Sequence, residues 1–283
     1  MNKATSDRII LTIDVLIISL FTGLALWGAL GPEPAIDLAR TLQTSSWTNP
    51  LGTDALGRDL LSRLGGVIIN AVLPVWAAAA FGSLVGWFMA ALAVLPISRA
   101  ASGISIVVGF IMLIVAAVPA GLLAFFGAVL AEQAGIGPIL AAIAIVMMAL
   151  AFVHLRNLHH ESAQLGHWVA FSALGGGDRE RLVNYGVFGD WQSSITDRLF
   201  FSLRAGIVIE ASVSWLGYGI QEPAASFGNM IAAHFDQWLR GNFHVLIVIV
   251  AGLALVTLLP TSLVRACRTL LRNAEFLDRK TKI

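Results

Sequence analysis

Long apolar runs separated by short polar segments dominate the hydrophobic pattern of this 283-residue chain. A helix needs about 20 apolar residues to cross the hydrocarbon core of a bilayer. The pattern holds six such runs and therefore predicts an all-α, polytopic membrane protein with six transmembrane helices. The expected bounds of these spans are 9–30, 65–95, 101–131, 135–153, 199–220 and 243–264.

The composition supports this class and excludes others. Hydrophobic residues make up 57% of the chain and charged residues only 12%, whereas a soluble domain carries about 25% charged residues. The net charge of +1 offers no basic surface for nucleic acid. The single cysteine, Cys267, excludes an internal disulfide framework and a site with several thiolate ligands. No obvious cleavage site follows the first apolar run, so we expect a retained helix and not a removed signal peptide.

The distribution of basic residues predicts the orientation of the chain in the membrane. An even number of spans places both termini on one face, and that face then holds thirteen of the 18 Lys and Arg residues. By the positive-inside rule it is the cytoplasmic face. The expected organisation is an N-terminal cytoplasmic segment with the first helix (1–30), an outer, periplasmic loop with a short amphipathic helix (31–64), a five-helix core (65–264) that includes a cytoplasmic loop at 154–198, and a cytoplasmic tail (265–283).

The outer loop ends in a compact polar segment, "LGTDALGRDLLSRL", at 51–64. A glycine permits a sharp turn at its start, and Thr53 or Asp54 can cap a helix that follows. Asp54 precedes Arg58 by four residues, and Asp59 precedes Arg63 by four, a spacing that suits ion pairs along a helix. We expect a short amphipathic helix whose charges face water; the alternative is a capped helix with no direct part in substrate handling. The candidate residues are Gly52, Thr53, Asp54, Gly57, Arg58 and Asp59.

A second stretch, "IEASVSWLGYGIQEPAASFGNMI" at 209–231, follows further along the chain. Together with 51–64 it resembles the C-type permease subunits of the dipeptide, oligopeptide and nickel family of ABC importers. Phe227 stands where that family usually has tryptophan. The resemblance implies the type I fold of ABC importer permeases, with an outer segment near the gate where a binding protein docks.

The same resemblance implies a set of partners and a location. The partners are a homologous B-type permease subunit, two ABC ATPase subunits and an extracytoplasmic solute-binding protein, in the bacterial inner membrane. ATP and Mg²⁺ bind in the ATPase partners, so this chain needs no cofactor and is not itself an enzyme. The chain indeed carries no phosphate-binding GxxxxGK[ST] segment. The cargo of the family is peptide, nickel or a metal chelate, moved inward by alternating access.

The loop between the fourth and fifth predicted spans contains "VAFSALGGGDRERLVNYGVF" at 169–188. In the family this loop forms the helix that contacts the ATPases, with the pattern Glu-Ala-Ala, three residues, Gly, nine residues, Ile-x-Leu-Pro. Ala170, Ala173 and Gly175 fit that pattern, whereas Val169 replaces the glutamate and Phe171 the second alanine. The alternative is a solvated loop with a broken helix. The predicted coupling residues are Trp168, Val169, Ala170, Phe171, Ala173, Leu174, Gly175, Asp178 and Arg179.

Ionisable groups within predicted spans are candidates for the translocation path, because such groups are rare in lipid. Glu210 lies within the fifth predicted span, with Ser214 one turn further on, and both are candidates. The alternative for Glu210 is a buried glutamate bonded to a neighbouring helix. Six histidines invite a nickel relay, since imidazole binds nickel, but ordinary loop histidines are the preferred interpretation and no metal site is predicted. They are His154, His159, His160, His167, His234 and His244.

Two other classes of protein fit an apolar six-span chain. A secondary carrier without ATPase partners would show inverted repeats and broken midplane helices, and no convincing repeat is present. An intramembrane enzyme would need paired acids or a Ser/His arrangement at matched depth. Co-purification of ATPase chains separates these classes from an ABC permease.

Overall fold

The computed structural model describes residues 3–31, 34–94, 99–130, 135–162, 164–177, 180, 189 and 191–281. These residues are largely helical, and within them extended pairing is limited to an isolated bridge between Thr53 and Asp59. The chain divides into two compact units: one comprises Met1–Leu73 and Ser214–Ile283, and the other comprises Pro74–Val213. The predicted all-α membrane fold is confirmed.

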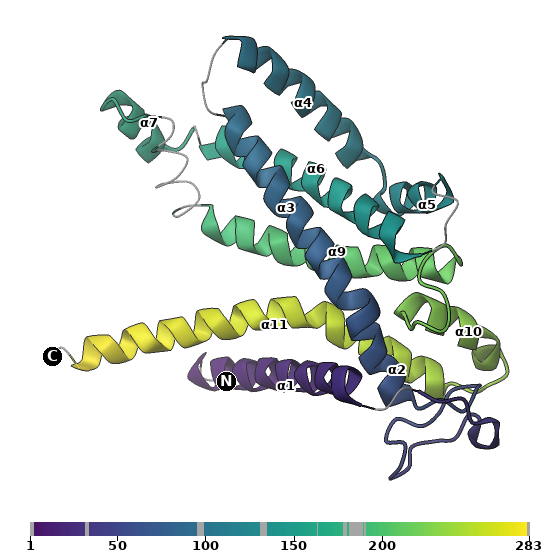
Figure 1. The fold of residues 1–283 in the computed structure, drawn as a ribbon. Coiled ribbons are helices and arrows are strands. Elements are labelled where there is room, and N and C mark those ends of the chain that lie inside the picture. Colours follow the sequence, from purple (N-terminus) through teal and green to yellow (C-terminus); the bar gives the residue numbers. More distant parts are fainter. Residues whose placement is uncertain are drawn as a thin grey trace. The chain divides into compact units, whose positions relative to one another are not determined.

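The first unit contains the two ends of the chain. Its main helices are α1 (Lys3–Leu30), α2 (Leu60–Val67), α10 (Phe227–Leu239) and α11 (His244–Thr281), with a 3₁₀ turn, η1, at Leu38–Arg40. Helix α1 packs along both α11 and α2 (Figure 1). A Cβ on Gly28 would lie 2.2 Å from the carbonyl oxygen of Gly65, so the backbones of α1 and α2 touch where neither residue has a side chain.

A π-helical segment, η2 (Ile68–Val72), follows α2 directly. Pro74 causes this π turn. It has no N–H to donate to the carbonyl of Asn70, and its ring would collide with that carbonyl in a regular α-helix. The wider π turn relieves the collision, and the helical run continues from Leu60 to Val94.

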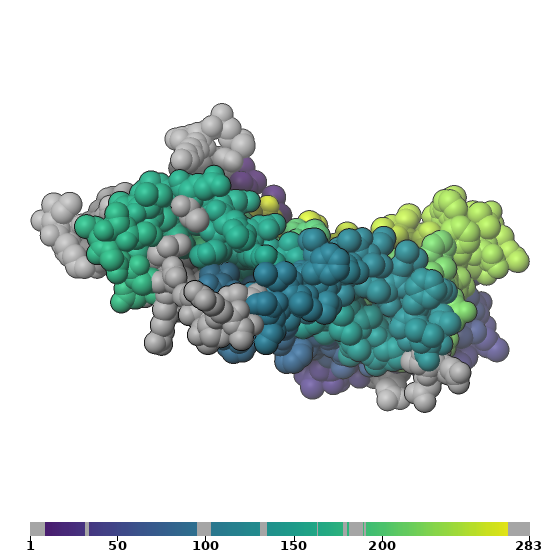
Figure 2. All heavy atoms as spheres, turned by 90° about the horizontal axis from the view of Figure 1, so that it is seen from above, coloured from purple at the N-terminus to yellow at the C-terminus, as the bar shows by residue number. Residues whose placement is uncertain are grey.

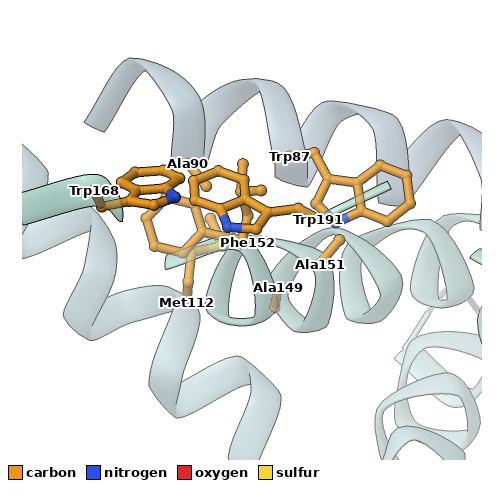
Figure 3. Close-up of a cluster of buried hydrophobic side chains, with 9 residues drawn as sticks. Trp87, Ala90, Met112, Ala149, Ala151, Phe152, Trp168 and Trp191 are labelled. Carbon is orange, nitrogen blue, oxygen red and sulfur yellow. The ribbon is translucent and has the colours of Figure 1, made fainter. Parts of the chain in front are cut away.

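The second unit is built from α3 (Leu73–Val94), α4 (Arg99–Ala117), α5 (Ala120–Leu130), α6 (Ile136–Ser162), α7 (Gly166–Ala173) and α9 (Gln192–Trp215). Small residues again permit close packing, because a Cβ on Gly82 would lie 2.2 Å from the carbonyl oxygen of Ala144. The core is a cluster of aromatic and small side chains that α3, α4, α6, α7 and the residue before α9 contribute (Figure 3).

Four helical segments in the described residues are long and apolar enough to cross a membrane: Ile9–Leu30, Leu60–Val94, Ile136–Ser162 and His244–Leu270. They correspond to the first, second, fourth and sixth predicted spans. The protein is therefore a multi-pass membrane protein.

The third and fifth predicted spans differ from the expectation. The third, 101–131, consists of two helices bent by 93° at a break that contains Pro119, because Pro119 ends α4 and its carbonyl accepts the first bonds of α5. Counting that pair as one span gives at most five. The fifth, 199–220, is covered by α9 as far as Trp215, but Arg204 and Glu210 interrupt its apolar run and Arg198 directly precedes it. The count of six spans stays a prediction.

The predicted cytoplasmic loop at 154–198 is also shorter than expected. Helix α6 continues to Ser162 and α9 already begins at Gln192. All four inner histidines therefore lie on helices and not in a loop, three of them on α6 and His167 on α7. The apolar part of the sequence ends before α6 ends, and a hydropathy pattern does not detect a helix that continues into a polar segment.

Candidate functional site

Two glycines give the outer loop between α1 and α2 its shape. Gly52 and Gly57 adopt φ values of +80° and +73°, which side-chain-bearing residues rarely adopt. A Cβ on Gly57 would lie 1.7 Å from the carbonyl oxygen of Asp37, so the loop closes on itself at that point. The family-like segment is thus a set of tight turns up to Arg58, and the predicted helix begins only at Leu60.

Replacing Gly57 with alanine is expected to destabilise this loop. A left-handed backbone costs a non-glycine residue about 1–3 kcal/mol, and the collision with the backbone of Asp37 adds to that cost. Thermal unfolding in detergent should show a lower midpoint for Gly57→Ala. Gly23→Ala is the control, because a Cβ there meets nothing within 4 Å; equal midpoints for the two variants would contradict this role of Gly57.

Thr53 joins the two halves of the loop. Its backbone N–H donates to Gln43 O over 3.0 Å, its hydroxyl accepts the N–H of Gln43 over 2.9 Å, and the same hydroxyl donates to the carbonyl of Arg40. Thr53 is fully buried. It stabilises the loop and does not cap a helix as predicted.

Asp54 organises the turn that follows. Its Oδ1 accepts the backbone N–H groups of Leu56 and Arg58, both over 2.9 Å, and its Oδ2 accepts Arg58 Nε over 2.7 Å. The predicted pair of Asp54 with Arg58 is therefore present, although it spans a turn and not a helix. Asp59 is the actual N-cap of α2, since its Oδ2 accepts the N–H and hydroxyl of Ser62 over 2.8 and 2.9 Å.

Glu222, in the loop between α9 and α10, binds both arginines of the segment. Its carboxylate receives Arg63 through two bonds of 2.6 and 2.9 Å and Arg58 Nη1 at 2.7 Å. Arg63 is only 1% exposed, Arg58 6% and Asp54 0%. The prediction that these charges face water is wrong, and the predicted partner of Arg63, Asp59, caps the helix instead.

The pKa of Glu222 shows which effect dominates in this network. Burial on its own raises the pKa of the carboxyl group, but the hydrogen bonds and charges of Arg63 and Arg58 outweigh burial, and the pKa is lowered. Burial disfavours the charged form of Arg58, yet its bonds to Glu222 and Asp54 raise its pKa overall. Each cation of the network, Arg58 and Arg63, has a carboxylate partner.

The lowered pKa of Glu222 predicts a pH dependence of stability. A carboxyl group whose pKa is lower in the folded state stabilises the fold above its unfolded pKa of about 4.3, and this contribution is lost as the pH falls through the folded value. Unfolding midpoints of the wild type and of Glu222→Gln should therefore differ at pH 7 and converge toward pH 3. A difference that is the same at both pH values would contradict the ionised network.

The second family-like stretch supplies a rigid loop that holds Glu222. Asn229 donates to the carbonyls of Ile220 and Ala224 over 3.0 and 2.8 Å, and it forms a reciprocal capping box with Ser226 at the start of α10. The hydroxyl of Ser214 accepts the N–H of Ile220 over 3.0 Å. Ser214, a candidate for the translocation path, thus holds the turn that follows α9.

Both outer histidines bind the backbone of segment 51–64. Nε2 of the buried His234 accepts the N–H of Ala55 over 3.3 Å while its Nδ1 contacts the carbonyl of Met230 at 2.8 Å, which defines the neutral tautomer with its proton on Nδ1. Nε2 of His244 lies 2.8 Å from the carbonyl of Leu51. The two family-like stretches, 164 residues apart at Arg58 and Glu222, therefore form one structural site with α10 and α11.

Glu210 lies in α9 and is fully buried. Its burial fits the alternative of a buried glutamate, and its part in a translocation path stays a prediction. The described residues place no group of three or more His, Cys, Asp or Glu side chains where they would hold a metal ion.

The predicted coupling segment forms α7, and Trp168 anchors it. Trp168 is 2% exposed and its ring stacks on that of Trp191 with centroids 5.3 Å apart (Figure 3). Trp191 in turn donates from Nε1 to the hydroxyl of Ser162 over 2.6 Å, and His159 packs edge-on against both indoles. Gly175 follows the helix with φ +85° and open space around it.

The opposite face of α7 is exposed and apolar. Helical spacing places Leu165, Val169 and Ala173 in one row, with Ala170 and Leu174 beside it, and Leu174 is 88% exposed. In the space-filling view the teal-green atoms of this segment lie at the surface of their unit (Figure 2). Phe171, a departure from the family pattern, packs back against Gly176. Asp178 and Arg179 lie outside the described residues.

Sequence reasoning missed two functional candidates. Glu222 was part of the quoted stretch but was not recognised as the partner of the arginines. Asp14, only 1% exposed within the first span, accepts Arg265 Nη2 of α11 over 2.7 Å. The acid in the first apolar run could have indicated this ion pair, because a carboxylate buried in a membrane requires a partner.

Fold and site together define a multi-pass membrane protein with an ion-paired outer segment and a small surface helix anchored by stacked tryptophans. A comparison with models of known protein families finds no match. The chain is similar to a probable D,D-dipeptide transport system permease protein of Escherichia coli (strain K12), with 27% identity over 228 residues that cover 75% of this chain and 70% of that protein. This similarity confirms the resemblance to dipeptide transport permeases that segments 51–64 and 209–231 indicate.

Proposed function

We propose that this chain is the C-type permease subunit of an ATP-driven importer that moves short peptides into the cell by alternating access. The observation that carries this proposal is the similarity to a dipeptide transport permease over three quarters of the chain. The two stretches that resemble the family most specifically also meet through Arg58, Arg63 and Glu222.

A peptide cargo is favoured over nickel or a metal chelate. The imidazoles of His234 and His244 bind the backbone at Ala55, Met230 and Leu51. Both ring nitrogens of His234 are engaged in this way, so this imidazole would have to give up one of these bonds to bind a metal ion. The named cargo of the E. coli protein is a dipeptide, and its transfer to this chain is part of the proposal.

Helix α7 is proposed as the element that the ATPase subunits contact. Its exposed row of small and apolar side chains fits a groove on a soluble partner, while the buried Trp168 ties any movement of α7 to the core of its unit. ATP and Mg²⁺ would bind in those partners. Without the family's glutamate at Val169, contact through the apolar face is the main source of affinity.

The remaining partners and the orientation belong to the same proposal. A homologous B-type permease would supply the other half of the pathway, and an extracytoplasmic solute-binding protein would deliver the peptide to the outer face. The excess of Lys and Arg supports cytoplasmic termini in a bacterial inner membrane. Residues 51–64 then face the outside and 163–191 face the cytoplasm.

Reconstitution tests this function against its rival. The tagged chain, co-expressed with its partner subunits, should retain two ATPase chains through purification. Proteoliposomes with the solute-binding protein should then take up labelled dialanine only with ATP and Mg²⁺. Uptake by this chain alone, driven by an ion gradient, would contradict the proposal and favour a secondary carrier.

A further inference from the structure

Helix α10 of the first unit carries an exposed surface of aromatic rings. Phe235 and Trp238 contact each other with ring centroids 5.6 Å apart. Trp215, at the end of α9, packs on Phe235 with centroids 6.4 Å apart, and Phe243, directly before α11, packs on Trp238 at the same distance. These four side chains and the neighbouring Leu239 are all exposed. They form one continuous surface, which we call the aromatic patch.

The exposed surface of α10 has an apolar side and a polar side. At 3.6 residues per turn, Phe235, Trp238 and Leu239 share one side of the helix. The exposed Asp236 and Arg240 point away from that side. An apolar side next to a charged one is typical of a helix that lies in the interface between lipid and water.

Helix α11 defines the depth of the aromatic patch in the membrane. Its membrane-spanning segment begins at His244, one residue after Phe243. Ile247 follows Phe243 by one helical turn and is exposed, so it extends the apolar surface of the patch into that segment. Helix α10 packs against α11 (Figure 1). The patch therefore lies where the hydrocarbon core meets the headgroups, the depth at which tryptophan is enriched in membrane proteins.

The length and the charges of α10 exclude a transmembrane position for this helix. Its 13 residues span about 20 Å at 1.5 Å per residue, whereas the hydrocarbon core is about 30 Å thick. Asp236 and Arg240 would be costly in hydrocarbon. Indole rings suit the headgroup region, because they combine a large apolar face with an N–H that water or a headgroup can accept.

We propose that α10 is an interfacial helix and that the aromatic patch binds the headgroup region of the bilayer. On its buried side, His234 binds the N–H of Ala55, and the capping box at its start holds the loop that carries Glu222. Lipid thus contacts one side of α10 while segment 51–64 contacts another, and the patch fixes the depth of the ion-paired segment at the membrane surface. The proposal depends on the membrane position of α11 and not on the cargo or the ATPase partners.

Quenching by lipid tests this proposal. The full chain, with the subunits that co-purify with it, is placed in nanodiscs of phosphatidylcholine. Cys267→Ala removes the native thiol, and Leu239→Cys carries a fluorophore within the patch. Its fluorescence should fall at least about twofold when the lipid is brominated near the carbonyl end of its acyl chains, and iodide in the water should have little effect. Ala233→Cys, exposed on the polar side of α10, is the matched control and should respond to iodide and not to the brominated lipid.

Three results would overturn the proposal. Equal quenching of positions 239 and 233 by iodide would place the patch in water. Protection of position 239 from both quenchers would show that protein covers the patch. Equal quenching of both positions by the brominated lipid would show that α10 does not present one side to the bilayer.

Trp238→Phe provides a second readout that uses the native side chain. The substitution keeps an aromatic ring in the patch, so the fluorescence that it removes from the wild type is that of Trp238. In brominated lipid this loss should be less than about half the loss in ordinary lipid, because the indole is already quenched there. An equal loss in the two lipids would contradict contact between Trp238 and the bilayer.

Discussion

Replacing Trp168 with alanine is expected to have the largest effect of any single change in the chain. The indole is 2% exposed and stacks on Trp191 within the core of α3, α4 and α6. Truncating a buried tryptophan to alanine costs about 3–5 kcal/mol. Chemical unfolding in detergent should show a loss of that size for Trp168→Ala. ATP-driven uptake should also fall by at least about tenfold, because each 1.4 kcal/mol of lost anchoring lowers the ratio of anchored to displaced α7 about tenfold.

A matched control for this change lies elsewhere in the chain. Trp47 in the outer loop is completely exposed, so Trp47→Ala removes the same atoms without leaving a cavity and should change stability by less than about 0.5 kcal/mol. Equal losses in the two variants would show that Trp168 does not anchor α7. Full uptake by a Trp168→Ala protein of lowered stability would show that the anchor is not needed for coupling.

Replacing Glu222 with alanine is expected to have the second largest effect. It leaves Arg58 and Arg63 buried without their shared carboxylate. Removing one partner of a buried ion pair costs about 3–5 kcal/mol. The Glu222 side chain is itself 41% exposed, and water that reaches the site screens the interaction, so we expect about 2 kcal/mol. The outer segment should become more sensitive to proteolysis in the same variant.

Asp236 provides the comparison for Glu222. It is an exposed acid on α10 of the same unit, and Asp236→Ala should leave both stability and protease sensitivity close to those of the wild type. Glu222→Asp should recover part of the loss, because it restores the charge on a shorter side chain. A Glu222→Ala protein as stable as Asp236→Ala would mean that the ion network contributes nothing to the outer segment.

The sequence was sufficient for the first and the last membrane helix. The run at 9–30 lies within α1, and the run at 243–264 lies within α11 except for Phe243, because a hydrocarbon environment selects for length and composition directly. It was insufficient at Pro119, where an apolar run of transmembrane length hides a bend of 93°. A hydropathy pattern reports the length and composition of an apolar run. It does not report the bend that forms where proline lacks a backbone hydrogen bond.

In the candidate site, too, the sequence predicts some features and not others. The tight turns at Gly52 and Gly57 and the pair of Asp54 with Arg58 depend on neighbours in sequence, and local spacing indicated the turn at Gly52 and the pair. The burial of these charges depends on Glu222, which is 164 residues away from Arg58 in the chain. Spacing rules cannot predict such a contact, and so the charges were wrongly expected to face water.

Helix α7 illustrates how a resemblance and a structure complement each other. The spacing of Ala170 and Gly175 located the segment, and the structure shows an eight-residue helix that ends before Gly175. The departures at Val169 and Phe171 acquire separate explanations: Val169 lies on the exposed apolar face, and Phe171 packs against Gly176. The family pattern alone does not distinguish an exposed position from a buried one.

Contact between α7 and an ATPase on the cytoplasmic side is the central claim of the proposed function, and cross-linking measures that contact directly. Ala173 is exposed on the apolar face of α7, so Ala173→Cys in a Cys267→Ala background should cross-link efficiently to a cysteine in the ATPase subunit of the assembled transporter. Thr48→Cys in the outer loop should not. Cross-linking of the ATPase from position 48 and not from position 173 would place the outer loop in the cytoplasm and α7 outside. That is the reverse of the proposed orientation and would contradict the proposed function.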